Sequence, residues 1–61
     1  MATVWFRETT EDQWSIACPF WKAINEDRAH DIADTYNPKH DYGMWWVTDH
    51  AGQKPPEDAQ P

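Results

Sequence analysis

The stretch from Ile24 to Tyr36, INEDRAHDIADTY, decides the fold because it is the one segment of the chain with an unambiguous helical period. Asn25 is a preferred N-cap residue, and the pair Asn37-Pro38 ends the helix because proline disfavours helical geometry in the residue before it. Four apolar residues recur at i, i+3, i+4 and i+7 and line one helix face: Ala29, Ile32, Ala33 and Tyr36. The sequence therefore predicts one helix with a narrow apolar stripe.

The opposite face of the predicted helix carries three aspartates with no lysine between them, Asp27, Asp31 and Asp34, which we call the acidic ridge. Like charges at these i+4 and i+3 spacings cost roughly a few tenths of a kcal/mol per pair. Arg28 is the only lysine or arginine in the segment. One interpretation is a solvated face of an acidic protein. The other is a surface that meets a basic region of a partner.

Length and charge limit the classes of function. The chain has 61 residues, which suffice for one domain with a small core, and nine aromatic residues, five of them tryptophan, supply large apolar area from few positions. Eleven acidic residues against five basic ones give a formal net charge of −6. Direct binding to nucleic acid or to anionic membranes is therefore disfavoured. The natural electrostatic partner is a larger protein with a basic surface.

Three further segments have the character of strands: residues 3–7 (TVWFR), 13–18 (QWSIAC) and 42–48 (YGMWWVT). The order strand, strand, helix, strand predicts a small α+β domain of ββαβ type over residues 1–50. We expect a three-stranded sheet with one helix packed on one face. Residues 51–61, AGQKPPEDAQP, are predicted to be a disordered, Pro-rich acidic tail.

A single helix covers one face of a sheet, so we expect the other face to expose an aromatic patch. Alternation along the strands predicts that Trp5 and one of Trp45 and Trp46 lie on the uncovered face. The residues expected to face the helix from the first two strands are Val4, Phe6, Trp14, Ile16 and Cys18. Tryptophan is enriched at the energetic centres of protein interfaces. Trp5, Trp45 and Trp46 are therefore the candidate partner anchors, of which at least one is expected to be buried instead.

Three alternatives stay open for the face opposite the helix. Phe20 or Trp21 could fold over it, the tail could cover it, or the protein could form a homodimer through it. A homodimer or a small assembly subunit is the second functional hypothesis. Its apolar contact would hardly respond to salt, whereas an acidic ridge bound to a basic surface would lose affinity steeply as salt rises.

Catalytic and metal-binding patterns are weak. His30 and Asp34 lie at i and i+4, and a divalent site can be drawn with residues of the flanking loops: His40, Asp41, Asp49 and His50. No HExxH, CxxC or HxH spacing supports such a site. Cys18 falls on the predicted core side of its strand, where a free cysteine is a small hydrophobe. We predict a protein that is not an enzyme, with no cofactor and no metal ion, and keep a small metal-binding protein as an alternative.

A single cysteine cannot form an internal disulfide, which favours a reducing compartment such as the cytoplasm. In outline the chain also resembles the small early proteins by which bacteriophages disable host enzymes, among them inhibitors of host RNA polymerase and of defence nucleases. The resemblance covers the element order from Thr3 to Thr48 and the acidic, aromatic composition, with no matched motif. It implies occlusion in the host cytoplasm, in which the acidic ridge occupies a basic channel and tryptophans anchor the contact.

Overall fold

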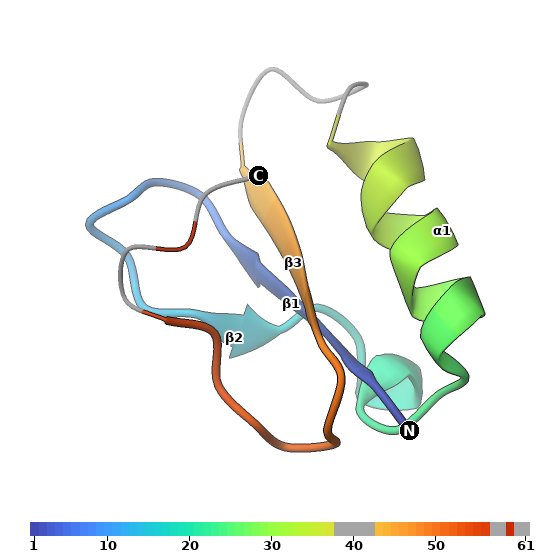
Figure 1. Ribbon diagram of the computed structural model, residues 1–61. Helices are drawn as coiled ribbons and strands as arrows, with labels where there is room; N and C mark the ends of the chain where they lie inside the picture. The colour runs from blue at the N-terminus through green and yellow to red at the C-terminus, as the bar shows by residue number, and fades with distance from the viewer. Residues whose placement is uncertain (38–42, 57–58, 60–61) are drawn as a thin grey trace.

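The computed structural model describes residues 1–37, 43–56 and 59 (Figure 1). Its elements in chain order are β1 (Thr3–Arg7), β2 (Ser15–Ile16), the 3-10 helix η1 (Pro19–Trp21), α1 (Glu26–Tyr36) and β3 (Met44–Thr48). β1 is the central strand and pairs antiparallel with both β2 and β3. With α1 packed against this sheet, the predicted α+β domain of ββαβ type is confirmed. Residues 38–42, of which Tyr42 begins the third predicted strand, lie outside the described residues.

α1 begins where the sequence predicts, because Asn25 caps it. The Asn25 side-chain Oδ1 accepts hydrogen bonds from the backbone N–H of Asp27 (2.9 Å) and of Arg28 (3.3 Å). These bonds satisfy two of the N–H groups that the first turn leaves without partners in the helix. The apolar stripe faces the sheet, with Ala29 and Ala33 buried. The small size of these alanines lets the helix approach the sheet closely.

The core on the helix side centres on Val4 and Ala29, both fully buried, together with Ala2. Ala2 exchanges two backbone hydrogen bonds with Ile24, of 2.7 and 2.9 Å, which fixes the chain just before α1. Partly buried residues of η1, α1 and β3, and of the segments that follow β2 and precede α1, complete this core: Ala17, Trp21, Ile24, Ile32, Trp45 and Val47. Apolar area therefore comes from tryptophan and small aliphatic side chains, as expected for so short a chain.

β2 has two residues instead of the six predicted, and its facing is the reverse of the prediction. Ile16 lies opposite Trp5 in the register, so the two side chains share the face away from α1. The backbone N–H of Ala17 donates to the carbonyl of Val4 at 3.0 Å, and Ala17 packs against the core. The sequence could not decide which set of alternating residues faces α1, because both sets contain apolar residues. The smaller Ala17 takes the helix side, and the larger Ile16 takes the other.

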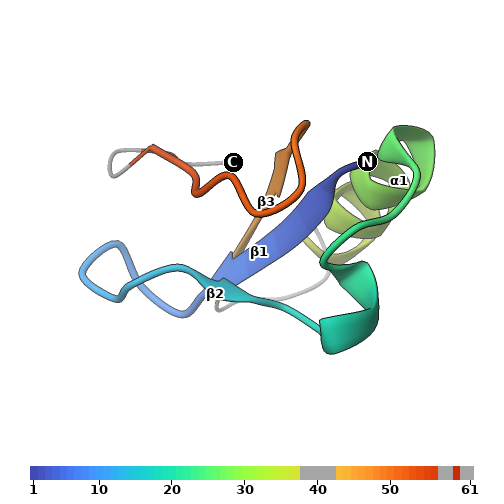
Figure 2. The same cartoon turned by 90° about the horizontal axis from the view of Figure 1, so that it is seen from below.

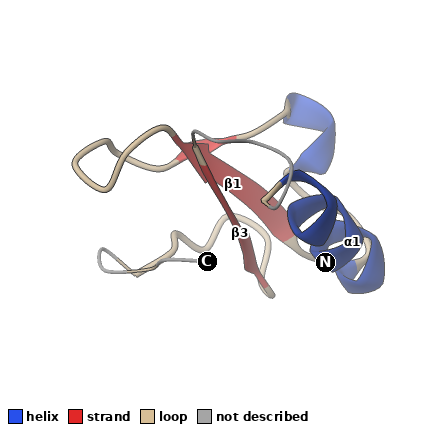
Figure 3. Ribbon diagram, turned by 90° about the horizontal axis from the view of Figure 1, so that it is seen from above, coloured by secondary structure: helices blue, strands red, loops and turns tan. Residues whose placement is uncertain are grey.

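The face opposite α1 is not bare, because the segment that follows β3 lies along it. This segment turns back at the Thr48 end of β3 and runs alongside the sheet (Figure 1 and Figure 2, orange to red). Figure 3 shows α1 and this segment on opposite sides of β3. The Gly52 backbone N–H donates to Thr3 Oγ1 at 3.0 Å, near the start of β1. The Arg7 Nη2 donates to the Ala59 carbonyl at 2.7 Å, near the end of β1.

Two corrections to the predictions follow from this packing. Residues 51–61 were predicted to be a disordered tail, with a tail that covers this face as one alternative, and Pro55 and Ala59 are buried. Trp5 was predicted on an exposed face, yet it is 4% exposed and its indole Nε1 donates to Thr48 Oγ1 at 2.9 Å. The physical reason is the same in both cases. A chain this short gains more by covering a tryptophan face with its last residues than by leaving both in water.

Candidate partner-binding surface

The acidic ridge lies on the side of α1 opposite its buried stripe, with Asp34 at the edge that borders β3. Asp27, Asp31 and Asp34 are all exposed, while Ala29 and Ala33 on the opposite side are buried. Within the part of the chain that the structure describes, none of the three carboxylates forms an ion pair with a lysine or arginine. Their charge is therefore directed to solvent instead of being neutralised inside the molecule.

A groove of about 590 Å³ lies between α1 and β3. Its walls are mostly apolar and come from one side of the helix and from the edge strand: His30, Ala33, Asp34, Asn37, Trp45, Trp46 and Val47. Of the six candidate residues, the groove therefore brings together Asp34, Trp45 and Trp46. Asp27, Asp31 and Trp5 do not line it.

Polar contacts between α1 and β3 mark the two ends of the groove. At one end the Asn37 side chain exchanges two hydrogen bonds with the backbone of Trp45. Toward the other end His30 Nε2 lies 3.5 Å from Asp49 Oδ1, just past β3. α1 and β3 run in opposite directions (Figure 1), so these contacts hold the helix and the strand together along the groove. His30 and Asn37 were not predicted as site residues. The i, i+4 spacing with Asp34 was the only signal for His30 in the sequence, and Asn37 had none as a site residue.

The tryptophans do not form the exposed patch that the sequence predicts. Trp45 is half-buried on the helix side, where its ring stacks on Tyr36 with centroids 4.7 Å apart and lies 5.0 Å from the ring of Phe6. Trp46 is half-buried at the groove. The large apolar residue that is most exposed among those described is Phe20 of η1, at 85%. Sequence reasoning placed Phe20 as a possible cover of the sheet, so its exposure was missed.

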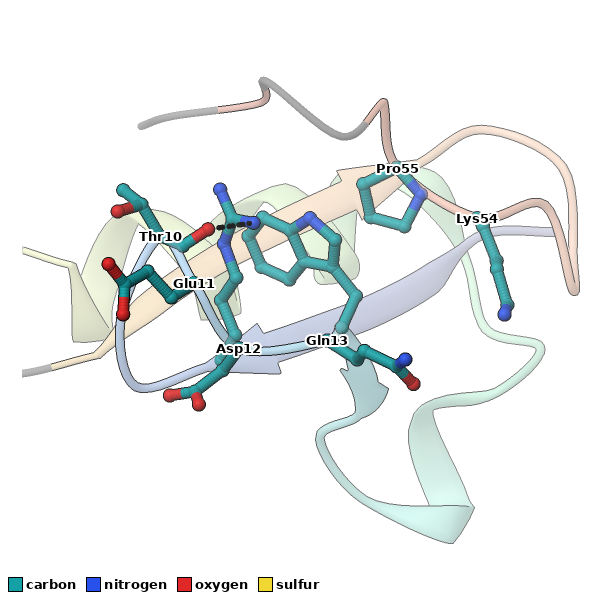
Figure 4. A pocket seen from close by; sticks show the side chains of 8 residues that line it. Thr10, Glu11, Asp12, Gln13, Lys54 and Pro55 are labelled. Carbon is teal, nitrogen blue, oxygen red and sulfur yellow. Dashed lines mark hydrogen bonds between the residues drawn. The ribbon is translucent and has the colours of Figure 1, made fainter.

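A second hollow, of about 490 Å³, lies between the β1–β2 loop and the C-terminal segment (Figure 4). Arg7 is buried here, with its guanidinium carbon 4.3 Å from the centroid of the Trp14 ring and its Nη1 3.3 Å from the Thr10 carbonyl. Figure 4 shows Glu11 and Asp12 on one side of this hollow and Lys54 on the other, so the rim carries both charge signs. Because Arg7 binds backbone carbonyls on two segments, its role here is structural.

Of the residues considered for metal binding, His30 and Asp49 lie in contact, with His30 Nε2 3.5 Å from Asp49 Oδ1. In residues 1–37, 43–56 and 59, no group of three histidine, cysteine or carboxylate side chains is arranged to hold a metal ion. His40 and Asp41 lie outside these residues. Cys18 is half-buried, and no hydrogen bond joins it to a histidine there.

No family model, curated protein or solved structure matches this chain. In the described residues, neither helix is long and apolar enough to span a bilayer. Two exposed features, the acidic ridge and the groove between α1 and β3, adjoin one another because Asp34 belongs to both.

Proposed function

We propose that this protein is a non-catalytic binding module that occupies a basic, nucleic-acid-binding surface of a larger enzyme and inhibits it by occlusion. An RNA polymerase or a defence nuclease has such a surface, and the outline resemblance to phage inhibitors motivates these targets in the cytoplasm of a host cell. The observation that carries the proposal is the acidic ridge. Its three carboxylates are exposed and have no lysine or arginine partner among the described residues.

The spacing of the ridge supports a match to a surface that binds phosphates. With a rise of about 1.5 Å per residue, Asp27, Asp31 and Asp34 follow one another at intervals of about 6 Å and about 4.5 Å along the helix axis. Phosphates of one DNA strand follow one another about every 3.4 Å of the duplex axis. The spacing between charges in the ridge is thus of the same order as the spacing between phosphates, although the ridge is shorter and its charges are further apart. A channel lined by lysine and arginine would attract it.

The net charge of the chain supports the same direction of binding. A formal charge of −6 on 61 residues steers the molecule toward a basic surface and away from nucleic acid itself. Such long-range attraction raises the association rate, whereas the dissociation rate depends on contacts that exclude water. The apolar walls of the groove beside Asp34 supply a place for such contacts.

The test is displacement of DNA from candidate targets by the purified protein. A panel of bacterial RNA polymerase core enzymes and defence nucleases is loaded with a fluorescent duplex, and release is followed by anisotropy at low and at high salt. We expect release from at least one target at low salt and a steep loss of inhibition as salt rises. Failure to displace DNA from every member of the panel at low salt would overturn the proposal.

Two variants with the same change in net charge separate the ridge from the overall charge. The ridge variant carries Asp27→Lys and Asp31→Lys, and the control carries Glu8→Lys and Glu11→Lys, at exposed positions of the β1–β2 loop. We expect the ridge variant to inhibit about tenfold more weakly than the control. Circular dichroism monitors α1, since Asp27 lies in its first turn and favours the helix dipole. Equal losses in both variants would mean that no defined surface is used.

A further inference from the structure

The outer edge of β3 presents backbone groups to the groove. Residues opposite one another in an antiparallel pair alternate between exchanging two backbone hydrogen bonds and exchanging none. Trp45 is of the second kind, because its N–H donates to the Asn37 side chain at 2.9 Å. Its neighbour on the same edge, Val47, lies opposite Val4. The carbonyl of Val4 accepts from Ala17 on the β2 side at 3.0 Å, so Val4 also points its backbone groups away from β3. Val47 N–H and C=O therefore point outward, away from β1.

The two outward-facing residues of the strand differ in one respect. Asn37 already binds both backbone groups of Trp45. Val47, by contrast, has no hydrogen-bond partner on this edge within the described part of the chain, and it lines the groove. An extended peptide that adds to an edge strand forms its backbone hydrogen bonds to such groups. The edge is open for pairing at Val47 and closed at Trp45.

The residues that line the groove indicate which kind of side chain on the added peptide would fit it. Ala33, Val47 and the two tryptophans give it apolar walls, and Asp34 places an exposed carboxylate at its rim. Neither lysine nor arginine is among its lining residues. A long apolar stem with a cationic end fits this arrangement, because the stem packs on the walls while the charge stays at the wet rim. Arginine suits it better than lysine, since a guanidinium can bind a carboxylate through two parallel hydrogen bonds.

We propose that the groove between α1 and β3 binds an extended, arginine-containing segment of a partner protein, which pairs with the backbone of Val47 and places its guanidinium at Asp34. This inference deepens the proposed function, on which its biological setting rests, by naming the kind of partner segment that is held. It uses a different surface from Asp27 and Asp31, so the two proposals are tested separately.

The test titrates the full-length, ¹⁵N-labelled protein with a capped pentapeptide that has a central arginine flanked by valines and threonines. We expect saturable NMR shifts at the Val47 amide and the Trp46 indole at millimolar peptide. Replacing the arginine with citrulline keeps its shape but removes the charge, and methylating the peptide backbone nitrogens removes the donors for strand pairing. Each change should weaken binding several-fold.

Matched protein variants separate the groove from general acidity. Asp34→Asn removes the rim carboxylate. It should weaken binding of the arginine peptide by about three- to tenfold and leave binding of the citrulline peptide unchanged. Asp31→Asn removes the same charge from the same helix outside the groove and should change binding by less than about twofold. Both aspartates are exposed, so both variants should fold.

Several outcomes would overturn the inference: shifts that do not saturate, shifts that cluster around Asp27 and Asp31 instead of Val47, or equal binding of the arginine and citrulline peptides. Shifts at Val47 that depend on protein concentration without peptide would show that a second copy occupies the groove. Peptide binding without DNA displacement would support the groove as a peptide site and contradict the proposed class of target. DNA displacement without peptide binding would support the proposed class of target and contradict the groove as a peptide site.

Discussion

The side chain of Asn37, the C-cap residue of α1, binds both backbone groups of Trp45 in β3: its Nδ2 donates to the Trp45 carbonyl at 3.1 Å, and its Oδ1 accepts from the Trp45 N–H at 2.9 Å. The amide thus takes the place of a residue on a neighbouring strand. It joins the helix to the sheet and closes part of an edge that would otherwise invite pairing with another chain.

We predict that Asn37→Ala lowers the free energy of unfolding by about 2 kcal/mol, because two hydrogen bonds to the partly buried backbone of Trp45 are lost. Urea unfolding followed by tryptophan fluorescence measures this loss. Asn37→Asp is the matched control. It keeps an acceptor for the Trp45 N–H but cannot donate to the carbonyl, so its stability should fall between those of the alanine variant and the parent. An alanine variant with an unchanged urea midpoint would show that the amide bonds contribute nothing.

Deleting residues 51–61 should destabilise the protein, because Arg7 loses the carbonyl of Ala59, Thr3 loses the N–H of Gly52, and the sheet loses the segment that lies along its face opposite α1. Hydrogen bonds of charged groups contribute about 1.5–3 kcal/mol each, so we expect a loss of roughly 2–4 kcal/mol once the apolar contacts are included. Thermal unfolding measures it, and quenching by acrylamide should increase as Trp5 becomes accessible. Lys54→Ala, at an exposed position of the same segment, should change stability by less than about 0.5 kcal/mol. If the truncated protein had the same melting temperature as the parent, residues 51–61 would not stabilise the fold, and the prediction of a disordered tail would be supported.

Two glycines form a matched pair for backbone strain. Gly43 has φ +87° and Gly52 has φ +83°, so alanine at either position costs about 1–2 kcal/mol in backbone conformation alone. A Cβ at Gly52 meets no atom within 4 Å, whereas a Cβ at Gly43 clashes with the ring of Phe6, which packs against Trp45. We therefore expect Gly43→Ala to be more destabilising than Gly52→Ala by at least about 1 kcal/mol in chemical denaturation. Equal losses would mean that Phe6 moves aside without cost.

Stability and binding should change in opposite directions at Asp31. Asp31→Lys converts two repulsive pairs, with Asp27 and with Asp34, into attractive ones and should stabilise the isolated protein by about 0.5–1 kcal/mol at low salt. The same variant should inhibit the target less well if the ridge binds a basic surface. Asp31→Asn removes repulsion without adding attraction and should give about half the gain. A lysine variant that is less stable than the parent would show that the ridge is not under repulsive strain.

The sequence predicted correctly those features that depend on interactions between residues close together in the chain. Asn25 caps α1 because its side chain reaches N–H groups two and three residues ahead, and the buried stripe from Ala29 to Ala33 follows from the helical period. The existence of three strands is also correct. The two-residue length of β2 could not be predicted, since pairing depends on where β1 lies and not on the β propensity of residues 13–18 alone.

The candidate site was only partly predictable for the same reason. The exposure of the acidic ridge followed from the helix period. The groove did not, because it requires α1 and β3 to lie side by side, and its residues Asn37 and Val47 carry no signal of their own. Trp5 was assigned to a partner, although it is 4% exposed and its indole already donates to Thr48.

The sequence by itself determined the composition and charge of the chain, the position and phase of α1, and the face of that helix on which the acidic ridge lies, because these depend on residues within a few positions of each other. Only the tertiary structure decided which tryptophan is buried, which side of the sheet Ile16 and Ala17 face, and where the C-terminal segment packs. Alternation along a strand is symmetric between its two faces, and this symmetry is broken only when distant parts of the chain compete to cover the same apolar surface.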